Sequence, residues 1–167
     1  ELISISTFYK KFTDPIERAV DPNTNDLATQ VFFRNVEEAW LAGMEFEFRK
    51  RLDFVTPALN NFSMGLNVAY IYSQVDISEG ELALIRVNDP DADDQRVMFG
   101  QSPYIVNAIL SYDNPANSIN ANINFNVQGQ RLAVVSTGAI PNVYEQARPA
   151  LDFNFKKGIR KNWSLKL

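Results

Sequence analysis

The chain has 167 residues, of which 46% are hydrophobic and 22% charged, and its formal net charge is −4 at pH 7. It contains no cysteine and no histidine, which excludes disulfides, thiol nucleophiles, histidine acid–base chemistry and the common zinc sites. The negative charge balance argues against a nucleic-acid partner. Apolar runs do not exceed about five residues, so the sequence excludes a transmembrane helix and still allows membrane-spanning strands.

Alternating side chains predict seven strands along the chain. They cover residues 1–12, 30–53, 62–76, 103–113, 119–131, 144–157 and 163 onward. The first strand begins at Glu1 without an initiator methionine or a signal peptide, and the last stops at Leu167 without a turn. We therefore expect the chain to be a fragment of a longer protein.

The second predicted strand shows how each strand divides into two faces. Its apolar face holds Met44, Phe46 and Phe48. Its charged face holds Glu45, Glu47 and Arg49. At about 3.3 Å per residue such a strand crosses a hydrocarbon layer when it is tilted. One apolar and one polar face over this length are typical of an outer-membrane barrel strand.

Long and short connections alternate between the predicted strands. The long ones are residues 13–29, 77–102 and 132–143. The short ones are residues 54–61, 114–118 and 158–162. Outer-membrane barrels have tight periplasmic turns and extended outer loops. The pattern therefore predicts that the first, third, fifth and seventh strands run outward and that the long connections lie outside.

Residues 119–128 give the clearest alternation of the chain, because an apolar residue precedes each amide residue. The apolar set is Ile119, Ala121, Ile123, Phe125 and Val127, and the amide set is Asn120, Asn122, Asn124, Asn126 and Gln128. Pairing this strand with the preceding one predicts that Leu110 lies beside Ala121 and Ala108 beside Ile123.

Aromatic residues provide a second, independent measure of strand length. Phe62 and Tyr70 are eight residues apart, and so are Tyr104 and Tyr112. This spacing corresponds to roughly 20 Å of height at a tilt near 40°. It predicts two aromatic girdles, one at each membrane interface.

Five segments carry a family resemblance. They are Asn35 with Gly43, Glu45, Phe46 and Glu47, then GQSPYIVNAILSYDN (residues 100–114), the pair Gln130 and Arg131, PNVYEQARPALDF (residues 141–153), and the terminal NWSLKL. Together they resemble the C-terminal barrel region of Bacteroidetes-type TonB-dependent outer-membrane receptors. The resemblance extends over nearly the whole chain.

This resemblance implies an all-β fold, an antiparallel transmembrane β-barrel of about 22 strands, of which residues 1–167 supply about seven. It also implies an N-terminal plug, a periplasmic carboxypeptidase-regulatory-like domain, a place in the outer membrane of a Gram-negative cell, and energised uptake through contact with TonB. The expected partners are outer-membrane lipid, the rest of the barrel with its plug, TonB, and a surface lipoprotein or envelope complex. No cofactor is implied.

The candidate site residues are those expected to face the barrel lumen. They are Glu45, Glu47, Arg49, Asn107, Asn120, Asn122, Asn124 and Asn126. The charged residues are interpreted as a wall of compensated charges in preference to a catalytic carboxylate pair. The asparagines are interpreted as a wetted wall or a surface against which the plug docks, in preference to a contact for carbohydrate or peptide backbone.

The sequence shows no catalytic constellation, and we expect no enzymatic activity and no metal site. Asp89, Asp91 and Asp93 are spaced like the start of a calcium loop, but Asp94 replaces the turn glycine and Gly100 replaces the closing glutamate. A solvated acidic loop is the preferred interpretation. Two other functions remain open: a passive porin or barrel anchor of an envelope assembly, and a soluble β domain whose apolar face forms a core.

Overall fold

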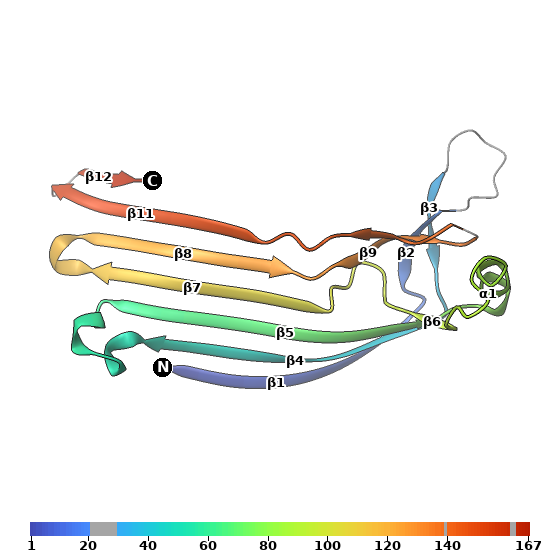
Figure 1. Cartoon of the computed structure of the whole chain (residues 1–167). Helices are drawn as coiled ribbons and strands as arrows, with labels where there is room; N and C mark the ends of the chain where they lie inside the picture. The colour runs from blue at the N-terminus through green and yellow to red at the C-terminus, as the bar shows by residue number, and fades with distance from the viewer. Residues whose placement is uncertain (21–29, 139, 161–162) are drawn as a thin grey trace.

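A computed structural model of the chain describes residues 1–20, 30–138, 140–160 and 163–167, and its strands form two sheets (Figure 1). The large sheet has the order β1 (Leu2–Thr13), β4 (Glu38–Arg51), β5 (Phe62–Asp76), β7 (Tyr104–Asn114), β8 (Ile119–Gln128), β11 (Ala150–Arg160) and β12 (Trp163–Lys166), with β6 (Gln95–Arg96) beside the end of β5. The small sheet has the order β10 (Val143–Glu145), β9 (Arg131–Ser136), β2 (Ile16–Val20) and β3 (Val31–Asn35).

All neighbouring strands of the large sheet are antiparallel, which confirms the seven predicted strands in their predicted order. One end of this sheet carries short 3-10 turns at Leu52–Phe54, Pro57–Leu59 and Pro115–Asn117, and we call it the turn end. The other end carries the small sheet and the helix α1 (Glu79–Ile85), and we call it the loop end (Figure 1). Long and short connections therefore lie at opposite ends, as predicted.

Three strands predicted as continuous are each divided between the two sheets. Residues 30–53 form β3 and β4, residues 119–131 form β8 and the start of β9, and residues 144–157 form most of β10 and most of β11. The long connections are also more ordered than expected. Residues 13–20 contain β2, residues 77–102 contain α1 and β6, and residues 132–143 contain most of β9. Parts of the predicted connections 13–29, 132–143 and 158–162, namely residues 21–29, 139 and 161–162, lie outside the described residues.

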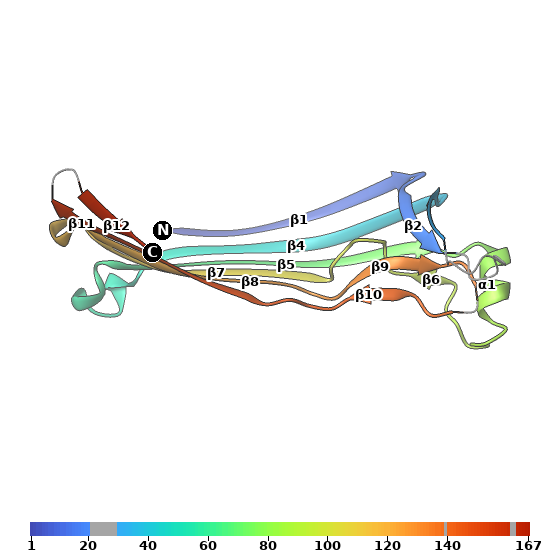
Figure 2. The same ribbon diagram turned by 90° about the horizontal axis from the view of Figure 1, so that it is seen from above.

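A corner in the β1–β4 pair causes the first of these divisions. Asp14 has a positive φ of 52°, and Pro15 has no N–H for a continuing ladder. Across the corner, Asp14 N donates to Glu37 O at 3.1 Å and Val36 N donates to Pro15 O at 3.1 Å. Backbone hydrogen bonding is thus preserved while β2 and β3 turn away from the large sheet (Figure 2).

The register gives the large sheet one apolar and one polar face, as the alternation predicted. One cross-strand row of the apolar face consists of Ile3, Phe48, Leu66, Ala108, Phe125 and Leu151. The matching row of the polar face consists of Ser4, Glu47, Asn67, Asn107, Asn126 and Ala150. Many large apolar side chains on the first face are exposed in this chain, so the face is available to an apolar environment.

The predicted register between β7 and β8 is wrong by two residues. Leu110 pairs with Ile123 and Ala108 pairs with Phe125. The connection is tighter than expected because both strands continue to the pair Asn114 and Ile119. A shift of two residues preserves the face of every side chain, so the assignment of faces is unaffected.

The aromatic spacing is matched across neighbouring strands. Phe62 pairs with Tyr112, with ring centroids 4.8 Å apart, and Tyr70 pairs with Tyr104. Trp40 lies toward the loop end, with its ring 6.1 Å from that of Tyr9. Two aromatic groups therefore border the apolar face, one near each end of the sheet.

Two glycines explain why apolar side chains occur on the polar face. A Cβ atom at Gly43 would lie 2.5 Å from the Phe8 ring and 2.6 Å from the Tyr70 carbonyl oxygen. A Cβ atom at Gly65 would lie 2.8 Å from the Ile109 side chain. Phe8 and Ile109 thus cover the strand where glycine leaves room.

The compact core lies at the loop end, where the two sheets meet. Ala19, Leu132 and Val135 are fully buried there, and Phe99 packs against them. Among the described residues, no helix has the length and apolar character needed to cross a membrane.

We predict that Gly43→Val destabilises the intact protein by about 1–3 kcal/mol, because the new side chain overpacks against Phe8 and the Tyr70 backbone. Gly80→Ala is the matched control, since an added Cβ meets no atom within 4 Å there. Thermal unfolding should show a lower midpoint for the first variant and no loss for the second. Equal midpoints would contradict the close packing at Gly43.

Candidate functional site

The candidate site is the polar face of the large sheet, where a chain of asparagine amides crosses three strands. Asn126 Nδ2 donates to Asn107 Oδ1, and Asn107 Nδ2 donates to Asn67 Oδ1 at 3.5 Å. These residues share one cross-strand row, because Asn107 pairs with both of the others. Both hydrogen bonds are donated in the direction from β8 to β5. The row therefore ends in the amide N–H groups of Asn67 on β5 and in the carbonyl oxygen of Asn126 on β8, on the side of β11.

A second amide group lies nearer the turn end. Asn122 Oδ1 accepts from Asn124 Nδ2 at 2.9 Å and from Asn154 Nδ2 at 3.1 Å. The two groups together form a continuous amide surface over β5, β7, β8 and β11. The structure therefore brings together four of the five predicted asparagines and adds Asn67 and Asn154.

The predicted charged residues border this amide surface on β4. Arg49 Nε lies 2.8 Å from Glu47 Oε1, as expected for compensated charges. Glu47 also pairs across the strands with Asn67, and Glu45 pairs with Ala69. A shallow cavity of about 240 Å³ lies over this junction and is lined by Glu47, Arg49 and four of the asparagines.

Asn120 is separate from the other predicted site residues. It lies at the turn end between Asp113 and Lys156, with which it pairs across the strands. These three residues line a different, larger cavity of about 780 Å³. Asn120 therefore belongs to the same face but to another environment.

The amide surface can bind ligands by hydrogen bonding because each asparagine retains donors and acceptors beyond those used in the row. Such a surface suits peptide groups or hydroxyls. Asn67 and Asn154 were identifiable from the sequence, since both occupy polar-face positions of predicted strands. Their membership of the site was not identifiable, because the asparagines that they contact on neighbouring strands depend on the register of the sheet.

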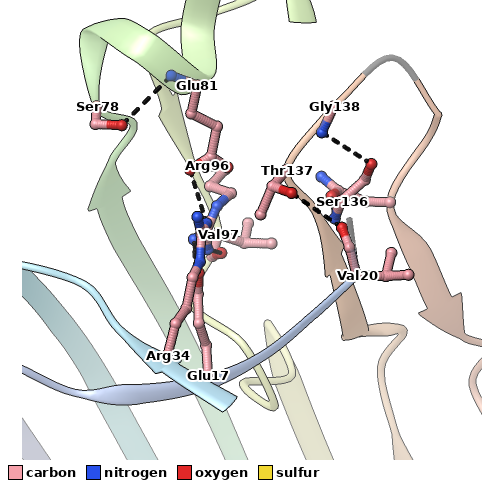
Figure 3. A network of polar contacts seen from close by, with 11 residues as sticks. Glu17, Val20, Arg34, Ser78, Glu81, Arg96, Val97, Ser136, Thr137 and Gly138 are labelled. Carbon is pink, nitrogen blue, oxygen red and sulfur yellow. Dashed lines mark hydrogen bonds and ion pairs between the residues drawn. The ribbon is translucent and has the colours of Figure 1, made fainter. Parts of the chain in front are cut away.

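A second polar cluster at the loop end was not predicted from the sequence (Figure 3). Glu17 Oε1 accepts from Arg34 Nε at 2.8 Å and from Arg96 Nη2 at 2.7 Å. Arg34 Nη2 also donates to Glu81 Oε2 at 2.7 Å. We call Glu17, Arg34, Glu81 and Arg96 the ion cluster. It joins β2, β3, α1 and β6.

Burial makes the ion cluster energetically important. The side chains of Glu17, Arg96 and Glu81 are 3%, 7% and 8% exposed. Burial opposes the charged form of Arg34, but the hydrogen bonds and charges of Glu81 and Glu17 outweigh it and raise the pKa of the guanidinium above its ordinary value. Arg34 therefore remains charged throughout the working pH range of proteins.

Two buried atoms of the ion cluster, one acceptor and one donor, form no hydrogen bond with the described residues. They are Glu81 Oε1 and Arg96 Nε. A buried polar atom without a partner costs about 1–3 kcal/mol. The cluster could not be found from the sequence, because its members come from four segments and Glu17 and Arg96 are 79 residues apart.

The acidic stretch at Asp89–Asp93 shows no clustering of ligands. Within the described ranges, no group of three or more histidine, cysteine, aspartate or glutamate side chains is placed to hold a metal ion.

Comparison with known proteins gives one structural match. No protein-family model and no curated protein sequence matches the chain. Among solved structures, the siderophore receptor PirA from Acinetobacter baumannii is similar, with a TM-score of 0.55 and 13% sequence identity. The alignment covers 95% of this chain and 23% of that receptor, so this chain corresponds to less than a quarter of its length. The match shows that the chain has the fold of a receptor barrel fragment.

We predict that Glu17→Gln destabilises the loop end by about 3–5 kcal/mol, because it leaves Arg34 and Arg96 without their shared buried counter-charge. The control is Glu145→Gln, which removes an exposed partner of Arg131 and should cost less than about 1 kcal/mol. Hydrogen exchange of the intact protein should show lost protection in β2, β3 and α1 for the first variant alone. Unchanged protection would show that the ion cluster does not hold the loop end together.

Proposed function

We propose that this chain is part of the barrel wall of a TonB-dependent outer-membrane receptor that takes up a scarce substrate, with no catalytic activity of its own. The observation that carries the proposal is a long antiparallel sheet with one apolar and one polar face, in the fold of a receptor barrel fragment. The Bacteroidetes type of receptor is favoured by the sequence resemblance.

The apolar face supports a lipid environment. Its strands are long, since β4 and β5 have 14 and 15 residues, whereas strands of soluble sheets usually have 3–10. Aromatic pairs border the face toward both ends, as in the girdles of outer-membrane barrels. A soluble β domain would need a second layer over this face, and the small sheet lies beyond its loop end (Figure 1).

The polar face supports an occupied lumen. Its amide surface offers hydrogen bonds suited to a docked protein segment, which we assign to the plug of the same receptor. The side chains of Ile105 and Ile71 are partly buried on this face. Ile109 also lies on this face and packs where Gly65 leaves room for it. TonB and a surface lipoprotein or envelope complex are the further partners of the proposal.

The facing of the strands is tested at two adjacent residues. Leu110 lies on the apolar face between Met64 and Ile123, and Ser111 lies on the polar face between Ser63 and Asn122. Leu110→Arg should cost roughly 2–4 kcal/mol in the membrane and Ser111→Arg much less. The measurement is heat-modifiable gel mobility of the intact protein extracted from outer membranes. Loss of the folded band with Ser111→Arg alone would invert the assignment of faces.

Energised uptake is tested against the porin alternative with cells and with liposomes. Deletion of the parent gene identifies the substrate as the nutrient that the cells no longer remove from the medium. In cells with the gene, uptake of this nutrient should stop when a protonophore collapses the proton-motive force. The purified intact protein should not make liposomes swell in small sugars, because a plug fills its lumen. Uptake that survives the protonophore, together with rapid swelling, would favour a passive porin.

A further inference from the structure

The β11–β12 hairpin carries a concentration of positive charge. Residues 153–167 contain five basic residues and no acidic residue, whereas residues 1–152 contain eleven basic and twenty acidic residues. The first segment therefore has a net charge of +5, and the rest of the chain has a net charge of −9 (11 − 20 = −9). The adjoining ends of β11 and β12 lie at the turn end of the large sheet (Figure 1), so the basic charge gathers at that end.

The basic side chains of the hairpin have no acidic partner within the described part of the chain. Those that the structure describes are Lys156, Lys157, Arg160 and Lys166, and none of them forms an ion pair with a described carboxylate. Lys156 is even the direct cross-strand partner of Lys166, and like charges in directly opposite positions destabilise a strand pair. An anionic group from outside the chain would therefore neutralise charge that is otherwise unbalanced.

Lys157 lies on the apolar face and extends toward its end. Its cross-strand partners are Ile119 and Leu165, which belong to the apolar sets of their strands. Its Nζ donates to the carbonyl oxygen of Asn117 at 2.7 Å, so the ammonium group lies beside the Pro115–Asn117 turn. Lysines at a membrane boundary extend in this way, with the stem along apolar surface and the charge in the polar layer. The ammonium group has three donors, of which this hydrogen bond uses one.

Arg160 and Trp163 continue this border of the apolar face. They lie directly opposite each other in the β11–β12 pair, and Trp163 shares the face of Leu165 because side chains alternate along a strand. Trp163 is 73% exposed and Ile159 is 64% exposed. A neighbouring barrel strand would pair with the backbone edge of β12, and these side chains would still point outward. The border therefore combines basic charge with a tryptophan, the residue typical of membrane interfaces.

We propose that this border of the apolar face binds the headgroups of anionic phospholipids. Lys157 and Arg160 contact the phosphate groups through charge-assisted hydrogen bonds, and Trp163 lies at the boundary with the acyl chains. An acidic protein segment would also neutralise the charge, but it would leave the adjoining apolar face exposed to water. The proposal rests on the barrel-wall function, because it requires the apolar face to lie in lipid. The predicted topology places this end of the sheet on the periplasmic side.

The test measures lipid contact at Trp163 in the intact protein, reconstituted into bilayers at physiological salt. Brominated lipids quench tryptophan fluorescence on contact, and each protein is measured with and without Trp163→Phe, so that the difference isolates this residue. Brominated phosphatidylglycerol should quench Trp163 at lower mole fractions than brominated phosphatidylcholine. Lys157→Gln and Arg160→Gln should each reduce this preference about fivefold, the effect of one basic residue near an anionic surface. Lys156→Gln is the matched control, because it removes the neighbouring charge from the polar face, and it should leave the preference unchanged.

Three results would overturn the headgroup site and leave the barrel wall intact. They are equal quenching by the two brominated lipids, equal effects of Lys156→Gln and Lys157→Gln, and loss of the preference on adding inorganic phosphate at matched ionic strength, which would indicate an ion site. Quenching by neither lipid would contradict the barrel-wall function as well, because Trp163 would then not face lipid. Heat-modifiable gel mobility checks that each variant is folded. Lipid preference does not depend on energised uptake, so a passive porin would give the same result.

Discussion

The continuous backbone hydrogen bonding of long antiparallel strands is the constraint on which this structure depends. β4 pairs with β1 along twelve residues and with β5 along thirteen. Because side chains alternate with a period of two, this ladder fixes the face of every residue once one residue is placed. The apolar and polar faces, the amide row and the aromatic pairs all follow from the same register.

The corner at Asp14 and Pro15 separates two parts with different chemistry. Beyond it, the strands shorten and the side chains no longer divide into one apolar and one polar face. Glu17 and Ala19 face the same interior, one within the ion cluster and the other within the apolar core. The large sheet provides two extended surfaces, whereas the loop end provides burial and charge pairing.

The strands of the large sheet and their two faces could be predicted from the sequence, because the alternation of apolar and polar residues is a local pattern. The run from Ile119 to Gln128 determines both faces of β8 by itself, and the amide residues were identified from it. The register of β7 and β8 was not predictable to the residue, since it depends on the tight turn in which Asn117 N donates to Asn114 Oδ1 and Ser118 has a positive φ of 52°. The ion cluster was not predictable at all, because no local pattern relates Glu17 to Arg96. The loop-end strands were missed for a similar reason: β2 has five residues and obtains one of its neighbours from a distant segment.

The parallel pairing of β2 with β9 has a consequence for the order of folding. Ala19 pairs with Val135 and Val20 with Ser136, so the contact joins residues more than a hundred positions apart, and an isolated chain closing that loop would lose much conformational entropy. The hairpins of the large sheet shorten this path in steps, since each brings the next strand beside the previous one. The small sheet can therefore assemble efficiently once β1, β4, β5, β7 and β8 are aligned, which makes the loop end a late-forming part of the molecule.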